Sequence, residues 1–597
     1  MKTCIQCKNR FEVSSRDKEF YKKISPVFGG KTFQIPEPTM CPLCRQMRRF
    51  AFRNERHLYK RKCDGSGKEI ISMYSPESPY KVYAQDVWWQ GNWDASQYGR
   101  DFDFSRPFFD QYKELMLATP RIALLNVNSV NSDYCNFTGD VKNSYLIFGS
   151  VYSEDCYYGS PYYSKNCVDT LVLRDCELCY ECIDCRKLYN CLYCQDCNGS
   201  NDLLYCFDLQ ACSDCIGCVG LRNKKYCYFN QQLSKEKYVE IRKGINLCDL
   251  ACVEFLAEEF EKLRRTVPHL CMLATGSVNV SGSHIFHSKN TSQSFFSDRC
   301  EDCSYCAQVV DLKDCFDNNY TEENELCYEY LGMYSTTRTF FSMFCRHTSE
   351  TFYSDYCVNC QNLFGCTNLR DKKYAILNKI YTKAEYESLV SRIVSHMKET
   401  GEWGEFPPMS ISPFAYNETV AHEYFPRVRE DVLAAGLRWK DDDRKEFQQQ
   451  TVSVPLDIKE VKDNICYEIL ACEVTGKNFR IIPQELAFYR RMNIPIPRRH
   501  PDQRHAERIA KRNPRMLFDR VCDKCGKKIL TSYPKESPYR VYCEKCYLGE
   551  VYGSRRSRES DRVEEVNRGI FYIHKLFLQN DTGLKPKIIY NSALLQN

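Results

Sequence analysis

The sequence lacks the segments that would direct a chain out of the cytosol or into a membrane. It opens with Met1-Lys2-Thr3-Cys4, without the apolar stretch of a signal peptide, and it contains no run of 18 apolar residues. Its formal net charge is only +5 over 597 residues. We therefore expect a cytoplasmic protein with no membrane partner, in which any binding of nucleic acid depends on local basic patches.

Recognisable catalytic motifs are also missing. The chain contains no His-Glu-x-x-His metalloprotease motif and no Gly-x-Gly-x-x-Gly loop between a strand and a helix. The stretch Gly29-Gly30-Lys31-Thr32 looks like the end of a phosphate-binding loop, but Ser25 stands at the position of its first glycine. The sequence therefore favours a protein without enzymatic activity, and it indicates no catalytic residue.

The 38 cysteines are unusually many for this length. In a reducing compartment they favour metal ligation or buried free thiols over disulfides. Two Cys-x-x-Cys pairs near each end of the chain have the spacing with which four thiolates hold one tetrahedral Zn²⁺. We predict two structural zinc sites, with ligands Cys4, Cys7, Cys41 and Cys44 at the first and Cys522, Cys525, Cys543 and Cys546 at the second.

Each of these zinc ribbons has a degenerate relative. The segment that begins at Cys63 is a near copy of the ribbon at Cys522, and the segment around Cys472 echoes the N-terminal ribbon. The missing ligands are replaced by Ser66, Ala84 and Val87 in the former and by Thr475, His500 and Gln503 in the latter. We expect the former to have lost its zinc and the latter to keep at most two plausible ligands.

Cysteines between the ribbons recur at a fixed interval. Two ladders advance by the same constant step, namely Cys176, Cys197 and Cys218, and Cys185, Cys206 and Cys227. This step, about 21 residues, makes one turn of a right-handed parallel β-helix. We therefore predict a β-solenoid of about 21 residues per coil, in which these cysteines stack roughly 4.8 Å apart.

This cysteine-rich section is duplicated. The tripeptide that begins at Ser129 recurs at Ser277, and the hexapeptide LRNKKY at Leu221 recurs as LRDKKY at Leu369, both 148 residues later. Helical sequence follows each copy, opened in the second by a capping box at Thr382. Such helices are expected to cover the open ends of the two solenoid copies.

The predicted fold is mainly β with α, with two tandem cysteine-rich parallel β-solenoid sections, helical caps and zinc-ribbon modules at both ends. We expect a zinc ribbon (1–62), a degenerate ribbon with an aromatic-rich helical segment (63–128), the first solenoid copy (129–232), a helical cap (233–276), the second copy (277–380), a helical cap (381–400), a linker with little core of its own (401–465), a degenerate basic ribbon (466–520), a zinc ribbon (521–552) and a C-terminal tail (553–597). The two ribbons with complete ligands are the modules expected to hold zinc.

The cysteine ladder admits two functional interpretations. Its Cys-x-x-Cys-x-x-Cys triplets resemble the ligand run of bacterial ferredoxins, so an iron–sulfur or thiol redox protein is one alternative. Candidate additional metal ligands are Cys176, Cys179, Cys182, Cys185, Cys191, Cys194, Cys197, Cys212, Cys215 and Cys218. We favour cysteine as a small apolar residue inside a narrow coil, because the second copy has lost most of these residues.

Aspartates precede many of these cysteines. They are Asp155, Asp175, Asp184, Asp196, Asp214, Asp302 and Asp314. A row of outward carboxylates on a β-helix would suit a protein that binds or cleaves polysaccharide. We favour the other interpretation, in which aspartate satisfies backbone groups at corners of the coil.

Basic residues cluster beside the ribbons at both ends, with tyrosine and phenylalanine nearby. Arginines in this setting suit phosphate backbones and exposed bases, although a solvated helix face has the same composition. The predicted nucleic-acid contacts are Arg45, Arg48, Arg49, Arg53, Arg490, Arg491, Arg498, Arg499, Arg504 and Arg508. RNA, DNA and a nucleoprotein all remain open as partners, and a protein partner is an alternative.

The stretches CPLCRQMRRFAFRNERHLYKRKC, GRDFDFSRPFF and GLRNKKYCYFN resemble those of a functionally uncharacterised cysteine-rich zinc-ribbon family of uncultured small-genome bacteria. The resemblance extends to about Tyr547. It implies zinc-ribbon ends around a cysteine-rich repeat region, and it implies no activity. Together with the residues, it leads us to expect a non-enzymatic zinc-binding scaffold that binds a macromolecule, with nucleic acid preferred.

Overall fold

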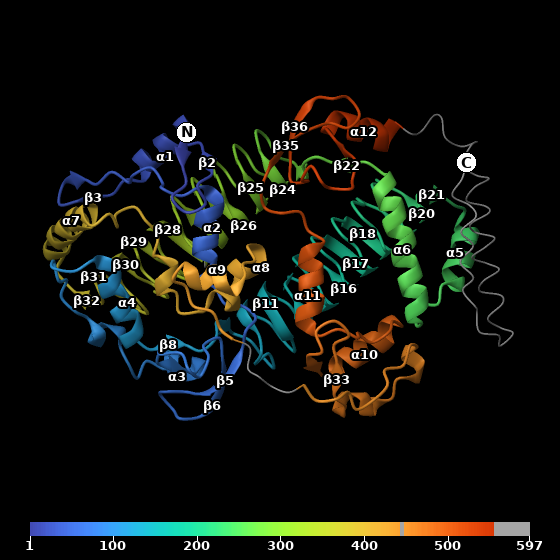
Figure 1. Cartoon of the computed structure of the whole chain (residues 1–597), viewed down its shortest axis with the longest axis horizontal. Coiled ribbons are helices and arrows are strands. Elements are labelled where there is room, and N and C mark those ends of the chain that lie inside the picture. Colours follow the sequence, from blue (N-terminus) through green and yellow to red (C-terminus); the bar gives the residue numbers. More distant parts are fainter. Residues whose placement is uncertain (333, 442–446, 554–597) are drawn as a thin grey trace.

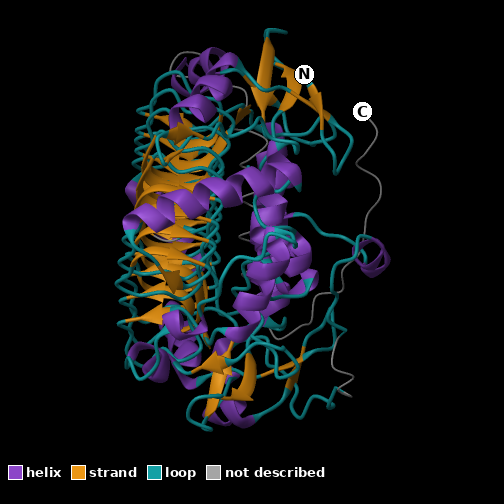
Figure 2. Cartoon of the chain, turned by 90° about the vertical axis from the view of Figure 1, so that its left-hand side faces the viewer, coloured by secondary structure: helices purple, strands orange, loops and turns teal. Residues whose placement is uncertain are grey.

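The computed structural model describes residues 1–332, 334–441 and 447–553, and the predicted tail lies outside them beyond residue 553. Two large sheets form the body of the molecule (Figure 1). Figure 2 shows strands stacked one above another, with helices across the stack, at its two ends and beside it. Both predicted cysteine-rich sections thus form large sheets, in a chain of mixed α and β structure. None of the described helices combines the length and the apolar character that a membrane span needs.

The first sheet has thirteen strands, and all its pairs are parallel except the last, between β20 and β21. Its strands are β9 (Asn126–Val127), β10 (Asn136–Gly139), β11 (Tyr145–Val151), β12 (Tyr157–Gly159), β13 (Pro161–Tyr162), β14 (Lys165–Val168), β15 (Leu173–Arg174), β16 (Glu177–Tyr180), β17 (Arg186–Leu192), β18 (Asn198–Leu204), β19 (Ser213–Ile216), β20 (Lys225–Tyr228) and β21 (Gln231–Gln232).

The second sheet has ten strands with the same pattern, ending in an antiparallel pair of β31 and β32. Its strands are β23 (Ala274–Thr275), β24 (Gly282–Phe286), β25 (Ser294–Asp298), β26 (Ala307–Lys313), β27 (Asn319–Glu325), β28 (Tyr334–Phe340), β29 (Ser349–Phe352), β30 (Gln361–Phe364), β31 (Lys373–Ile376) and β32 (Lys379–Ile380). The repeated architecture agrees with the duplication seen in the sequence.

Neighbouring strands pair residues that are twelve apart in the sequence. Cys167 lies opposite Cys179, Cys179 opposite Cys191, and Cys215 opposite Cys227. The longer interval predicted between stacked positions is therefore wrong. Cys176 and Cys197 do not stack, because their separation in sequence is not a multiple of the twelve-residue step between paired strands.

A left-handed backbone at every third residue explains the error. Asp175, Leu178 and Glu181 have φ angles of +55°, +56° and +51°, and the cysteine that follows each of them is buried. Each left-handed residue turns the chain, so side chains three apart all face the interior. Because the step from Cys176 to Cys197 is a multiple of three, both cysteines take the same buried position in the three-residue pattern, although they do not lie opposite each other on paired strands.

The aspartates before the cysteines occupy these left-handed positions. Asp155, Asp175, Asp184, Asp196, Asp214, Asp302 and Asp314 all have φ between +50° and +57°. Aspartate and asparagine tolerate this conformation better than most residues. This placement favours the backbone interpretation of these carboxylates over a polysaccharide-binding row.

The inward cysteines contact backbone carbonyl groups. The Cys206 sulfur lies 3.5 Å from the carbonyl oxygens of both Leu204 and Cys215. Its equivalent in the second copy is Ser354, whose hydroxyl donates to the Phe352 carbonyl at 2.9 Å. Cysteine and serine therefore fill the same interior position, which supports a structural role for the ladder.

At one place in each sheet, the residues that pair across neighbouring strands are eleven apart in the sequence and not twelve. Tyr157 lies opposite Val168 in the first sheet, and Val278 opposite Lys289 in the second, which are steps of eleven residues. Gly159 and Gly282 lie at these steps. A Cβ atom there would approach Thr170 O to 2.5 Å and Ser294 O to 1.7 Å, respectively, so only glycine fits.

Helices follow the last strands of each sheet, as predicted. Ser234 caps α5 (Lys235–Gly244), and the capping box at Thr382 opens α7 (Lys383–Glu399). A further helix, α6 (Leu250–Thr266), lies between the two sheets in sequence. The first part of the predicted linker (401–465) is packed and not free of core contacts, because Trp403, Phe406 and Phe414 are buried in a large core.

Four small modules carry the terminal cysteine turns. Each carries its Cys-x-x-Cys turn or the degenerate equivalent on an antiparallel strand pair: β1 (Lys2–Thr3) with β2 (Arg10–Phe11), β5 (Tyr59–Lys62) with β6 (Glu69–Ser72), β33 (Leu470–Ala471) with β34 (Asn478–Phe479), and β35 (Phe518–Val521) with β36 (Lys528–Thr531). The first module also contains the antiparallel pair of β3 (Val27–Phe28) and β4 (Lys31–Thr32). The first and third modules continue into equivalent helices, namely α1 (Ser15–Ile24) and α2 (Pro42–Phe50), and α10 (Pro483–Met492) and α11 (Pro501–Ala510). The remaining two each contribute a strand to a parallel pair that precedes a large sheet: β7 (Val82–Tyr83) with β8 (Arg121–Ile122), and β37 (Val541–Tyr542) with β22 (His269–Leu270).

Candidate metal centres and the cleft between the sheets

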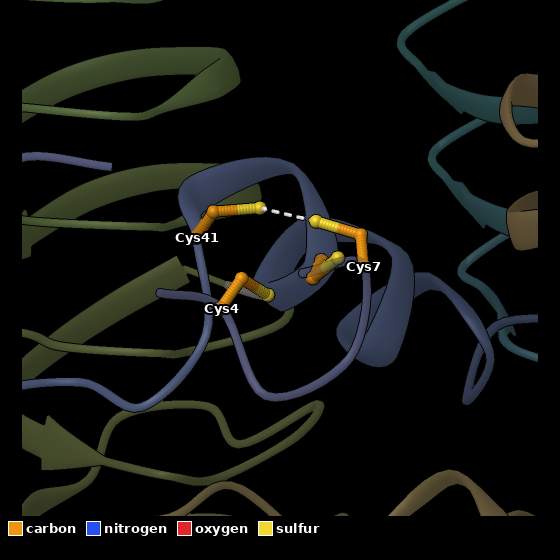
Figure 3. A group of neighbouring side chains, drawn as sticks. Cys4, Cys7 and Cys41 are labelled. Carbon is orange, nitrogen blue, oxygen red and sulfur yellow. Dashed lines mark hydrogen bonds between the residues drawn. The ribbon is translucent and has the colours of Figure 1, made fainter. Parts of the chain in front are cut away.

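The first four-cysteine group is assembled from a strand turn and a helix start. Cys4 and Cys7 lie in the turn between β1 and β2, Cys41 caps α2, and Cys44 lies in its first turn. Their sulfur atoms all lie within 4.8 Å of one another. Figure 3 shows the side chain of Cys7 directed toward that of Cys41, at 3.7 Å between the sulfurs. This group can hold one metal ion.

The second group has the same construction. Cys522 and Cys525 lie in the turn between β35 and β36, whereas Cys543 and Cys546 lie at the start of α12 (Glu544–Gly553). The four sulfurs again lie within 4.8 Å of one another, and those of Cys525 and Cys543 are 3.8 Å apart. All eight predicted ligands are thus brought together in the two predicted sets of four.

Local hydrogen bonds favour the thiolate form, which binds metals, at Cys41 and Cys522, whereas the hydrogen bond with Cys41 raises the pKa of Cys44. The side chain of Cys44 lowers the pKa of the Cys41 thiol to about 5. Burial raises the pKa of the Cys522 thiol, but the backbone N–H groups of Cys543 and Cys525 outweigh it and lower that pKa to about 6. Both groups therefore contain a thiol poised to ionise at neutral pH.

The two degenerate turns keep the same backbone without the ligands. The Cys63 sulfur accepts backbone N–H groups from Ser66 at 3.3 Å and Ala84 at 3.2 Å. His500 caps α11 by accepting the backbone N–H of Asp502 at 3.1 Å. Neither turn joins a group of three potential ligands in the part of the chain that the structure describes.

The cysteine ladder forms no comparable group. Among the described residues, no three of its sulfurs lie close enough together to share one ion. The candidate additional ligands from Cys176 to Cys218 are buried, and some lie opposite each other on paired strands, as Cys179 and Cys191 do. This arrangement speaks against a cluster-binding ladder.

The arginines of α2 are buried against the second sheet. Arg45 Nε donates to Asp317 Oδ2 at 2.8 Å, and Arg49 Nη1 donates to Glu329 Oε2 at 3.0 Å. Arg48 also pairs with Glu329, at 2.7 Å. These contacts, with a further one from Arg49 to Asn319 on β27, attach the first four-cysteine module to the second sheet, which α2 overlies in the view of Figure 1.

The arginines of α11 make equivalent contacts with the first sheet. Arg508 pairs with Asp169 at 3.1 Å and with Glu181 at 2.6 Å, and Arg504 also pairs with Asp169. Asp169 and Glu181 precede Asp317 and Glu329 by 148 residues each. The two copies therefore receive their basic helices at equivalent acidic pairs, and this shared offset is the sequence signal that could have revealed the contact.

Six of the ten predicted nucleic-acid contacts are consequently unavailable to a partner. Arg45, Arg48, Arg49, Arg53, Arg504 and Arg508 are all buried. The prediction is wrong for these six, because their guanidinium groups are enclosed by carboxylates or aromatic rings of the same chain. Arg490, Arg491 and Arg499 are exposed, and Arg498 is half-buried.

A cleft of about 680 Å³ lies between the two sheets. Tyr152 and Tyr163 line it from the first sheet, and Tyr334 lines it from the second; their side chains are 57%, 40% and 37% exposed. The rings of Tyr152 and Tyr163 stack with centroids 5.2 Å apart. Arg346, also in the cleft, lies over Tyr334 at 4.6 Å. Sequence reasoning missed these residues, and the left-handed backbone that Tyr152 and Tyr163 share, eleven residues apart, is visible only in the structure.

The cleft also contains charges of both signs. Arg174 lies 5.5 Å from the Tyr163 ring centroid, and Glu322 faces the same space. Burial raises the pKa of the Glu322 carboxyl, although Arg174 opposes this effect. The lining therefore offers aromatic faces, guanidinium groups and carboxylates rather than a uniformly basic surface.

Comparison with known proteins adds no functional information. No protein-family model and no curated protein matches the chain. Among solved structures, it is similar to a crystal structure described as that of an acetyltransferase from Desulfovibrio desulfuricans G20, with 11% identity over 40% of this chain and 58% of that chain, and a TM-score of 0.10. A similarity this weak carries no argument about fold or function.

Proposed function

We propose that the protein is a non-enzymatic, zinc-stabilised scaffold that binds single-stranded nucleic acid in the cleft between its two sheets. Four thiolates from two Cys-x-x-Cys turns are the donor set that Zn²⁺ prefers in structural sites. Each metal would hold one terminal module folded. The two sheets would act as β-solenoids with twelve-residue coils that keep the walls of the cleft rigid.

The exposed tyrosines are the observation that carries the proposal. Bases of single-stranded nucleic acid stack on aromatic side chains with little dependence on sequence, and arginine supplies contacts to phosphate. Tyr152 and Tyr163 present stacked rings in the cleft, and Arg346 lies on the opposite wall. The proposal keeps nucleic acid as partner but moves the contact from the buried arginines to this cleft.

Binding of a short fluorescent oligonucleotide, followed by anisotropy, tests the proposal. Stacking contributes about 1–3 kcal/mol per base, so the triple variant Y152A/Y163A/R346A should bind at least about tenfold more weakly than the wild type. These side chains are not fully buried, so the variant should fold normally. The matched control is R490A/R491A, which removes two exposed arginines of α10.

The two variants distinguish the alternatives. A loss of affinity in R490A/R491A with unchanged binding by the cleft variant would place the contact on α10 and refute the cleft. No measurable binding of RNA or DNA by the wild type at low salt would refute the function altogether, because phosphate contacts are strongest there.

A further inference from the structure

Three potential metal ligands meet where the two sheets face each other. Asp184 and Asp196 lie on successive turns of the first sheet, and His284 lies on β24 of the second. One ligand atom from each lies within 4.8 Å of the other two. His284 Nε2 is 2.8 Å from Asp196 Oδ1, so the group bridges the sheets.

One carboxylate oxygen of this group is buried without a donor. The Asp184 side chain is 2% exposed, and its Oδ2 lies 2.8 Å from Arg512 Nε. Its Oδ1 has no hydrogen-bond partner among the described residues. An unsatisfied buried carboxylate oxygen is costly, and native proteins rarely leave one without a protein group, a water molecule or an ion. The ion pair between His284 and Asp196 leaves this atom unexplained.

The histidine can adopt the tautomer of metal-ligating histidines, in which Nδ1–H donates to the Ser283 hydroxyl. Its Nδ1 lies 3.1 Å from Ser283 Oγ, and its ring stacks on Phe296 with centroids 4.4 Å apart. A histidine that donates from one ring nitrogen to a fixed acceptor presents the lone pair of the other to a metal. In His284 that other nitrogen is Nε2, which faces the carboxylates.

The space at this group is large enough for an ion. A cavity of about 50 Å³ is lined by the three residues together with Arg512 and Tyr533. One water requires roughly 10–15 Å³ of such volume, so an ion with one or two waters fits. Asp184 and His284 also line the 680 Å³ cleft, so the site borders both spaces.

We propose that Asp184, Asp196 and His284 form a third metal site, for a divalent cation of the Mn²⁺–Zn²⁺ class. Two carboxylates and one imidazole form a harder donor set than the four-thiolate groups and suit Mn²⁺ as well as Zn²⁺. Arg512, Arg264 and Lys511 also line this cavity, so the proposal rests on the three converging ligand atoms and the unpartnered Asp184 oxygen and not on an excess of negative charge. Coordination positions not taken by these ligands would be open to water or to a donor from a molecule in the cleft.

Mn²⁺ binding to the full-length, zinc-loaded protein tests this site without any nucleic acid. Titration followed by electron paramagnetic resonance of free Mn²⁺ should give one bound ion per chain for the wild type. D196N and H284A should each weaken the affinity at least about tenfold, and S283A should weaken it less, because it disturbs only the orientation of the histidine. The matched control is H287N, since His287 lies three residues away, is 62% exposed and pairs with Asp298 outside the group.

The outcomes separate a metal site from a structural ion pair. Unchanged Mn²⁺ binding in both D196N and H284A would overturn the proposal. It would also be overturned if the wild type bound no Mn²⁺ and no third Zn²⁺ ion. Folding of each variant is verified by its content of two thiolate-bound Zn²⁺ and by its melting temperature without Mn²⁺. H284Q provides a second test should either variant fail to fold, because it removes the imidazole ligand and leaves the buried pair of Asp184 with Arg512 intact.

Discussion

Removal of Arg508 should release α11 from the first sheet. Its guanidinium is fully buried and pairs with Asp169 at 3.1 Å and with Glu181 at 2.6 Å. Breaking a buried ion pair from one side costs about 3–5 kcal/mol, since it leaves a charge without a partner. We expect the lower end for R508A, because Asp169 keeps Arg504.

Amide hydrogen exchange measures this loss directly. A loss of about 3 kcal/mol in local stability should accelerate exchange of the α11 amides by about a hundredfold. R499A is the control, because Arg499 is exposed, precedes the same helix and pairs with Glu507 at the surface, where such pairs contribute about 0–1 kcal/mol. Replacement of both partners by apolar residues of similar size, as in R508M/E181L, should restore most of the protection.

One result would refute this reasoning. If exchange in α11 were unchanged in R508A while nucleic-acid binding disappeared, Arg508 would be a contact residue and not a docking residue. Unchanged binding together with accelerated exchange would support the assignment made from the burial of its side chain.

Two further predictions concern the metal sites and pH. C7S should lose one of two bound Zn²⁺, whereas C63S, in the degenerate turn, should retain both; mass spectrometry of the native protein distinguishes them, and equal zinc content would contradict the ligand assignment. Burial lowers the pKa of His269 to about 3, so this ring is neutral in the folded chain, and its contribution to stability is present above the unfolded pKa of about 6.5 and lost as pH falls toward 3. In the wild type, protonation of His269 should lower the free energy of unfolding by about 2 kcal/mol between pH 6.5 and pH 5, at about 1.4 kcal/mol per pH unit. Urea titrations of H269Q should lack this part of the decrease. The same decrease in both proteins would contradict the role of His269.

Local spacing made the metal groups predictable. A Cys-x-x-Cys turn fixes two sulfurs within a few residues, so the sets at Cys4 and Cys522 could be assigned before their partners were located. The duplication was equally accessible, because a constant offset needs no knowledge of the fold. The interval between stacked residues could not be predicted in this way. A spacing of three residues determines which side chains face inward, but only the hydrogen-bond register between strands determines which of them stack.

The arginine clusters show a different limit. A run of basic residues has the same composition whether it faces a phosphate or a carboxylate of its own chain. The partners of Arg45 and Arg49 are Asp317 and Glu329, about 270 residues later, so nothing near α2 identifies them. The tyrosines of the cleft could not be predicted for a related reason. Tyr152 and Tyr334 line the same cleft, but they belong to two sheets that are far apart in the sequence.

The eleven-residue steps show how the two sheets tolerate a change in chain length. With one corner every three residues, a single deletion would turn every later inward side chain outward, unless one side of the coil absorbs it, and Gly159 and Gly282 occupy those sides. The offset between the copies is 148 residues at Ser129, 147 at Asp155 and 148 again at Cys197, because the second copy shortens earlier in its course than the first. Length changes in such a chain are therefore expected in whole units, with three residues rotating all that follows by one side of the coil and twelve adding one complete turn.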